Sequence, residues 1–180
     1  MIPRHPLRRE EFRIELRPYD FSCVPELYQA AIESRKEVSS WMDWLHADYK
    51  LQDVENWAAH AIDAWNRQSE YEFVIYDRKD GAVLGSCGLN HLNRQAKVAN
   101  LGYWVRTLRT RLGAATEATR LLKDFGLNIL GFNRLEIVIA DGNDASRRVA
   151  EKAGALYEGM QRRRIKVADK VYDAHMYAFV

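Results

Sequence analysis

The sequence is poor in the features that mark secreted, metal-binding and membrane proteins. It has only two cysteines, Cys23 and Cys87, which lie far apart and without metal-ligand spacing. We therefore expect buried thiols in a reducing compartment rather than a disulfide or a zinc pair, and no metal site. No apolar run approaches the ~20 residues of a membrane span, and no signal peptide opens the chain. A cytoplasmic location is expected.

The chain also has little excess charge of either sign. Its 27 basic and 25 acidic residues give a net charge of +2, whereas a dedicated nucleic-acid binder would carry a marked basic excess. Neither a nucleic acid nor a membrane is therefore expected as a partner. With 47% hydrophobic residues in 180, the chain can build one proper core. We expect a single domain over 12–180, preceded by a flexible, polar arm over 1–11.

Hydrophobic periodicity predicts an α/β domain. Alternating residues and apolar runs indicate strands over 12–18, 71–76, 83–92, 99–105, 134–140, 156–167 and 170–180. Helical spacing predicts helices over 24–32, 54–65, 114–130 and 143–152. Asp53 is expected to cap the second helix, Asn143 is expected to cap the last one, and a hairpin turn is expected at 79–81.

Both common nucleotide-binding loops, G-x-x-x-x-G-K-[ST] and G-x-G-x-x-G, are missing. Residues 101–118 instead run from an apolar strand through an Arg/Thr turn into the small residues Gly113, Ala114 and Ala115. Free amides at a helix start with so little side-chain bulk can point donors at a phosphate. Arg109 and Arg111 add positive charge beside them. The segment therefore predicts an anion-binding cradle.

Two motifs resemble those of the GNAT superfamily, the acetyl-CoA-dependent N-acetyltransferases. The stretch Thr110–Ala115 matches the pyrophosphate loop [Q/R]-x-x-G-x-[G/A], with Thr110 departing from the usual Gln or Arg. The stretch Asn143–Gly154 matches N-x-x-S-x-x-[apolar]-x-E-K-x-G and follows a β-rich run. Ser40–Leu45, Tyr157–Gly159 and Val171–Asp173 resemble the ribosomal-protein N-terminal (RimJ/RimL-like) branch. The resemblance covers about 12–180.

This resemblance implies a fold and a set of cofactor contacts. The expected fold is a mixed, mostly antiparallel sheet of about seven strands, flanked by helices and splayed at the acetyl-CoA site. Backbone groups near Trp104, Val105 and Arg106 would hold the pantetheine arm. The pyrophosphate would bind at Arg111, Leu112, Gly113, Ala114, Ala115 and Thr116. Asn143 would bond the pantetheine, and Ser146 would be the general acid that protonates the coenzyme A thiolate.

The general base is left open by the sequence. A Glu proposed as the base in one related branch aligns near Ile165 here, so that role does not transfer. His91 lies on a strand neighbouring the cofactor strand and has a suitable intrinsic pKa, so it is our candidate. Glu117 and Tyr103 are weaker candidates, and a water chain to bulk solvent is an alternative.

The acceptor side is predicted only in outline. Trp41, Trp44, Asn90 and Tyr103 are assigned to the acceptor site, although both tryptophans could equally belong to the core. We expect acetyl transfer to a primary amine, first of all a protein or peptide N-terminal α-amine. The alternatives are a small amine (a polyamine, an antibiotic or an amino-acid-like amine) and a non-catalytic acyl-CoA-binding module. A homodimer is also compatible, because the last two strands of such folds often pair across subunits.

Overall fold

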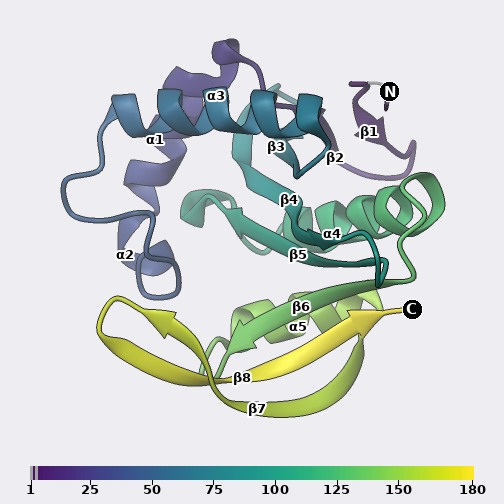
Figure 1. Cartoon of the computed structure of the whole chain (residues 1–180). Helices are drawn as coiled ribbons and strands as arrows, with labels where there is room; N and C mark the ends of the chain where they lie inside the picture. Colours follow the sequence, from purple (N-terminus) through teal and green to yellow (C-terminus); the bar gives the residue numbers. More distant parts are fainter. Residues whose placement is uncertain (1, 3) are drawn as a thin grey trace.

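A computed structural model describes residue 2 and residues 4–180. It contains one eight-stranded sheet in the order β1-β2-β3-β4-β5-β6-β8-β7 (Figure 1). The strands are β1 (Leu7–Arg8), β2 (Ile14–Pro18), β3 (Tyr71–Asp77), β4 (Val83–Asn93), β5 (Val98–Val105), β6 (Arg134–Ala140), β7 (Leu156–Val167) and β8 (Lys170–Phe179). The helices are α1 (Val24–Glu33), α2 (Arg35–Val38), α3 (Leu51–Arg67), α4 (Ala114–Asp124) and α5 (Asp144–Ala153). The mixed, mostly antiparallel fold expected from the sequence is confirmed.

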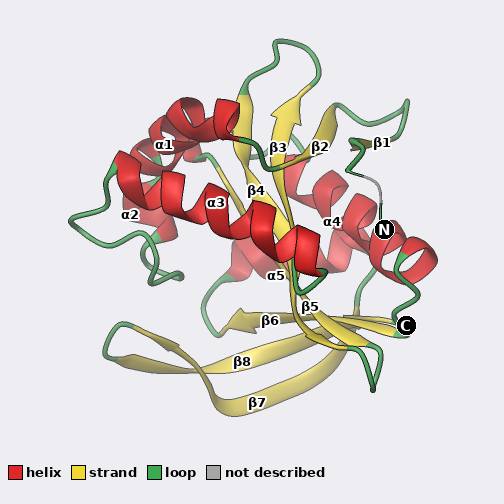
Figure 2. Ribbon diagram, turned by 45° about the horizontal axis from the view of Figure 1, so that its top comes forward, coloured by secondary structure: helices red, strands yellow, loops and turns green. Residues whose placement is uncertain are grey.

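Helices cover both faces of the central strands (Figures 1 and 2). Alternate residues of β3 and β5 therefore enter two different cores. Val74 and Trp104 pack with residues of α1 and α3, such as Leu27 and Ala58. Phe73, Leu101 and Tyr103 pack with residues of α4, such as Ala118 and Leu122. Burial from both sides explains why every residue of β3 is buried.

The sheet opens between β5 and β6. These two strands are parallel and pair only at Val98–Arg134, Ala99–Leu135 and Asn100–Glu136. Beyond Asn100 they diverge, while β5 keeps its antiparallel pairing with β4 as far as Val105 (Figure 1). We call the space between β5 residues 101–105 and the diverging β6 the β5–β6 gap. It is the splay that the sequence resemblance implied.

The caps of two helices explain where they begin. The side chain of Asn143 accepts a hydrogen bond from the amide of Ser146 at 3.1 Å, so Asn143 is the N-cap of α5 as predicted. The prediction that Asp53 is the N-cap of α3 is wrong. The N-cap is Lys50, and Asp53 lies three residues later, where its carboxylate accepts from the Lys50 amide at 2.7 Å. A carboxylate at this third position satisfies the free N-cap amide.

The ends of the chain add detail to the expected outline. Within the segment expected to be a flexible arm, Leu7 and Arg8 pair with β2 and add an eighth strand to the sheet. The helix expected over 114–130 ends as α4 at Asp124 and continues as a π-helical segment, Phe125–Ile129. At the other edge, β7 pairs with β8 of the same chain, so the homodimer stays a prediction. In the part of the chain that the structure describes, no helix is long and apolar enough to cross a membrane.

Gly85 allows β4 and β5 to approach closely at the site. Its φ is +145°, and a Cβ built on it would lie 2.2 Å from the carbonyl oxygen of Trp104. We expect Gly85→Ala to lower the free energy of unfolding by about 3 kcal/mol or more, because strain and overpacking add. Gly81→Ala is the matched control: its φ of +75° is also positive, but nothing lies within 4 Å of the added Cβ. The control should cost only about 1 kcal/mol in urea unfolding, and equal losses would contradict this account.

Candidate active site

A cavity of about 410 Å³ lies on the α1/α3 face of the sheet, beside the β5–β6 gap. Its walls are largely aromatic: Trp44 packs on Trp104 at 5.4 Å and on Tyr49 at 5.5 Å between ring centroids. Trp44 and Tyr49 come from the loop between α2 and α3, and Trp104 comes from β5. The lining residues are Tyr19, Leu27, Met42, Trp44, His46, Tyr49, Asp53, Trp57, Glu72, Ser86, Cys87, Asn90, Gly102, Tyr103 and Trp104.

Glu72 is a carboxylate buried in this cavity wall, with 6% of its surface exposed. It lies opposite Gly88 of β4 in the sheet register, and Gly88 lies opposite Gly102 of β5. A Cβ built on Gly88 would be 2.1 Å from Oε2 of Glu72, so the carboxylate occupies the space above that glycine. A Cβ on Gly102 would meet only Asn100 Nδ2, at 4.0 Å. The side chain of Glu72 is therefore accommodated by the missing side chain of its neighbour.

Two asparagines connect Glu72 to β4 and β5. Asn90 Nδ2 donates to Glu72 Oε1 at 3.4 Å, and Asn100 Nδ2 donates to Asn90 Oδ1 at 2.8 Å. The pKa of Glu72 is raised to about 7: burial and, to a lesser degree, the charge of Glu70 raise it, and the Asn90 hydrogen bond lowers it. The carboxyl group can therefore gain and lose a proton near neutral pH.

The hydroxyl groups of Ser146 and Tyr103 form a pair beside the core on the α4 side of the sheet. Tyr103 Oη and Ser146 Oγ lie 2.9 Å apart, and Tyr103 Oη also donates to the Ser146 carbonyl at 3.1 Å. Tyr103 packs against the α4 core. Burial raises the pKa of Tyr103 to about 12, so its hydroxyl stays protonated at neutral pH. This pair suits proton donation, which argues against Tyr103 as the base.

In the segment expected to bind a phosphate, small side chains leave the backbone amides at the start of α4 accessible. Gly113 is the N-cap of α4 with φ +84°, no side chain caps the helix, and Ala114 and Ala115 leave its first turn unobstructed. Arg111 precedes it with φ +64°. The side chain of Arg109 pairs with Asp80 at 3.1 Å. Leu112 and Thr116 complete the predicted loop.

The side chain and the amide of Arg106 are both engaged in hydrogen bonds away from the gap. Its guanidinium donates twice to the Glu33 carboxylate at 2.6 Å, and its amide donates to Leu84 O at 2.6 Å. Because residues of an antiparallel strand alternate between its two edges, the main-chain groups of Tyr103 and Val105 face the β5–β6 gap. The same alternation turns those of Trp104 toward β4. Of the three residues predicted to hold a pantetheine arm, Val105 alone offers its main chain to the gap.

Three other predicted residues lie outside the cavity wall. His91 is exposed, with a left-handed φ of +48°, at the outer end of β4. Glu117 accepts from the Ile14 amide at 3.2 Å and so ties α4 to β2. Trp41 packs on Tyr172 at 6.0 Å between ring centroids. Trp44, Asn90 and Tyr103, in contrast, all line the cavity.

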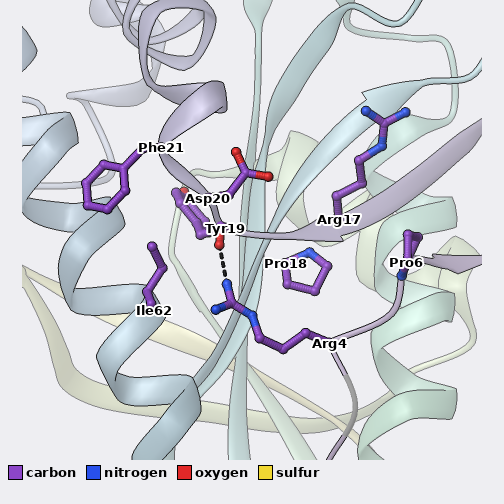
Figure 3. Close-up of a pocket in the computed structure, with 8 residues that line it drawn as sticks. All are labelled: Arg4, Pro6, Arg17, Pro18, Tyr19, Asp20, Phe21 and Ile62. Carbon is purple, nitrogen blue, oxygen red and sulfur yellow. Dashed lines mark hydrogen bonds between the residues drawn. The ribbon is translucent and has the colours of Figure 1, made fainter.

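A second hollow, of about 330 Å³, lies at the end of β2 and the segment that leads into α1 (Figure 3). There the Arg4 guanidinium donates to the Tyr19 carbonyl and holds the N-terminal segment against the body of the protein. Arg17, Asp20, Phe21 and Ile62 also line it. None of the residues predicted for the site lies here, so the aromatic cavity is the candidate active site.

Glu72 was not selected from the sequence, although a signal for it was present. The segment Tyr71–Asp77 reads Tyr-Glu-Phe-Val-Ile-Tyr-Asp, with charged residues only at Glu72 and at its last position, Asp77. A strand this apolar on both faces is typical of burial on both sides, and a carboxylate is rarely fully buried unless it is paired.

Comparison with known proteins assigns the family. A family model described as an acetyltransferase (GNAT) domain matches residues 13–156. The chain belongs to the GNAT acetyltransferases. The match includes the diverging strands, the start of α4, and α5 with Ser146.

Relatives and solved structures agree with this assignment. The "Putative ribosomal N-acetyltransferase YdaF" of Bacillus subtilis is 33% identical over 170 residues, 92% of this chain and 88% of that protein. The "Probable N-acetyltransferase YjcK" of the same organism is 33% identical over 110 residues, 61% of this chain and only 60% of its own length. The structure of RimL, a ribosomal L7/L12 α-N-protein acetyltransferase in complex with coenzyme A, superposes with a TM-score of 0.89 at 20% identity and covers 98% of both chains. At this identity the RimL structure supports the fold alone.

The buried carboxyl group of Glu72 predicts a pH-dependent stability. Its pKa rises from an ordinary 4.5 to about 7 on folding, so the folded protein keeps a proton that the unfolded chain releases between these values. The free energy of unfolding therefore falls as the pH rises from about 4.5 to 7, by about 3 kcal/mol from this group. We expect Glu72→Gln to match the parent at pH 4 and to be more stable by about that amount at pH 8. Urea unfolding at both pH values measures the difference, with Glu70→Gln as control; a gap of the same size at both would contradict the assignment.

Proposed function

We propose that this protein transfers an acetyl group from acetyl-CoA to a primary amine, and that its first acceptor class is the N-terminal α-amine of a protein or peptide. One observation carries the proposal. Strand β5, which borders the β5–β6 gap, has an aromatic cavity with a buried carboxylate on its α1/α3 face and packs on its other face against α4, which begins at an open helix start. A donor and an acceptor can thus meet from opposite faces of one sheet.

The donor side fits acetyl-CoA. The amides of the first turn of α4 and the side chain of Arg111 would hold the pyrophosphate, since a helix start attracts anions. The main-chain groups of Tyr103 and Val105 would bond the pantetheine arm as a neighbouring strand would. RimL, which shares the fold, is described in complex with coenzyme A. When bound, acetyl-CoA supplies the activated acetyl thioester.

The residues of this chain would hold the two reactants in position and donate a proton. Binding both reactants at the gap converts a bimolecular encounter into a reaction between held groups, which can account for much of an enzymatic rate. Ser146 Oγ, bonded to Tyr103 Oη, would donate the proton that the departing thiolate needs. Asn143 serves this step through the cap that fixes the amide of Ser146.

Relatives favour a peptide acceptor. YdaF, similar over almost the whole chain, is named for ribosomal N-acetylation. A second candidate is a small cationic amine such as a polyamine, because two carboxylates, Glu72 and Asp53, line the cavity.

Release of coenzyme A from acetyl-CoA, followed with a thiol reagent, tests the proposal. The panel comprises peptides beginning with Ala, Ser, Asp or Met, together with polyamines and amino acids. Turnover with the peptides supports the first acceptor class, and turnover with polyamines alone supports the second. Silence across the panel, with acetyl-CoA still raising the melting temperature, would favour a non-catalytic binding module.

Ser146→Ala tests the proton donor. The substitution keeps the backbone amide bonded to Asn143, so α5 should remain folded. We expect kcat to fall about 100-fold because a general acid contributes at least this much. Tyr103→Phe combined with Ser146→Ala should lose no more than the larger single loss if the two hydroxyls act as one unit. Ser69→Ala, in the turn before β3, is the control; unchanged turnover in Ser146→Ala would exclude the acid role.

A further inference from the structure

We infer that Glu72 is the general base of this reaction, and that its carboxylate receives the acceptor ammonium in the aromatic cavity and removes a proton from it. The inference rests on the proposed function and names the group that the family motifs leave unassigned in this chain. It also identifies the cavity as a binding site for an ammonium group whose adjacent atoms in the substrate are apolar.

The position of Glu72 in the register is the first support. Its side chain lies above Gly88, in the cross-strand row Glu72–Gly88–Gly102. Gly102 is on β5, where that strand borders the β5–β6 gap. The row therefore runs from the carboxylate to the place where a donor from the α4/α5 face would emerge. Any side chain at Gly88 would displace the carboxylate, since its Cβ would lie 2.1 Å from Oε2.

The unused hydrogen-bonding capacity of the carboxylate is the second support. Among the described residues, Glu72 receives one hydrogen bond, from Asn90 to Oε1 at 3.4 Å. No lysine or arginine lines the cavity in that part of the chain. A buried carboxylate is costly unless it is paired, so the site favours a ligand that brings its own positive charge. The rings of Trp44, Tyr49 and Trp104 surround that ligand with faces that attract a cation.

The groups that face Glu72 leave it able to titrate near neutral pH. Burial, with a smaller contribution from the charge of Glu70 two residues earlier, raises its pKa to about 7. Tyr19, which directly follows β2, and Cys87 of β4 also line the cavity; burial raises their pKa values well above the ordinary ones, so both stay neutral. The remaining titratable groups of the cavity are His46, Tyr49, Asp53 and Tyr103.

The proposed step balances in protons and electrons. The ammonium gives one proton to Glu72, which later passes it to solvent. The freed nitrogen lone pair forms the bond to the acetyl carbon, and the carbon–sulfur bond breaks with its electron pair on sulfur. The nitrogen loses its second proton to solvent as the amide forms. The sulfur gains a proton from the Ser146 hydroxyl, which regains one from solvent, so one net proton is released. The products are the acetylated amine and coenzyme A.

Glu72→Gln tests the inference on whichever amine of the panel the parent protein acetylates. At pH 8 we expect kcat to fall about 100-fold or more, with the affinity for acetyl-CoA unchanged. The acidic limb of the kcat/KM profile, near pH 7 in the parent, should disappear. Urea unfolding confirms that the variant is folded.

Two further variants separate a base from a structural role. Gly88→Ala keeps Glu72 but displaces its carboxylate, and it should also lose turnover. Glu70→Gln removes a charge outside the cavity, where the carboxylate bonds His60 at 2.9 Å; it should keep turnover and shift the acidic limb slightly to lower pH. If the parent protein acetylates an amine and Glu72→Gln is equally active, this inference alone is overturned. A parent that acetylates no amine overturns the proposed function and this inference with it.

Discussion

The parallel pairing of β5 with β6 ends after three residue pairs, and the architecture of the site depends on that ending. Backbone amides and carbonyls inside a sheet are normally all paired, because an unpaired buried group is costly. Here β5 continues for five more residues with one edge paired to β4 and the other facing the gap. An unpaired edge inside a sheet offers a ligand the hydrogen bonds of a missing strand. Because the two strands diverge, groups on the two faces of the sheet can approach each other through the gap.

The two faces of the sheet then have different roles. On the α4/α5 face lie an open helix start, with its attraction for anions, and the neutral hydroxyl pair of Tyr103 and Ser146. On the α1/α3 face lie aromatic rings and the Glu72 carboxylate, and no lysine or arginine among the described residues lines their cavity. The alternation of side chains along β5 produces this separation, because Tyr103 and Trp104 are neighbours in sequence and enter opposite cores. The proposed proton donor and the proposed proton acceptor therefore lie on opposite faces of the sheet.

Most of the fold could be predicted from the sequence because local signals agreed with the final packing. The bounds of β6 follow from an apolar run, and the cap of α5 by Asn143 follows from the preference of Asn for helix starts. The cap of α3 was misassigned because Asp is favoured both as the N-cap and three residues later, and only the observed hydrogen bond to the Lys50 amide distinguishes the two. The strand at Leu7–Arg8 has no hydrophobic pattern of its own and depends on pairing with β2.

Candidate site residues that belong to short contiguous motifs could be predicted from the sequence, whereas a residue placed by strand pairing could not. The loop before α4 and the pair Asn143 and Ser146 belong to contiguous motifs, and the family match covers both segments. Glu72 depends on the register of three strands and on two glycines in the neighbouring strands, which no short motif records. His91 was chosen for its residue type and for its place on a strand neighbouring the cofactor strand, and in the structure it is exposed near the end of β4.

The most direct test of this account is a crystal structure of the protein with a bisubstrate analogue, in which coenzyme A is joined through an acetyl linker to the acceptor nitrogen. The account predicts that the coenzyme A portion lies on the α4/α5 face and bonds the main chain of Tyr103 and Val105. It further predicts that the linker crosses the β5–β6 gap, with the acceptor nitrogen about 3 Å from a carboxylate oxygen of Glu72. Both halves of the analogue on one face of the sheet, or an acceptor nitrogen remote from Glu72, would contradict it.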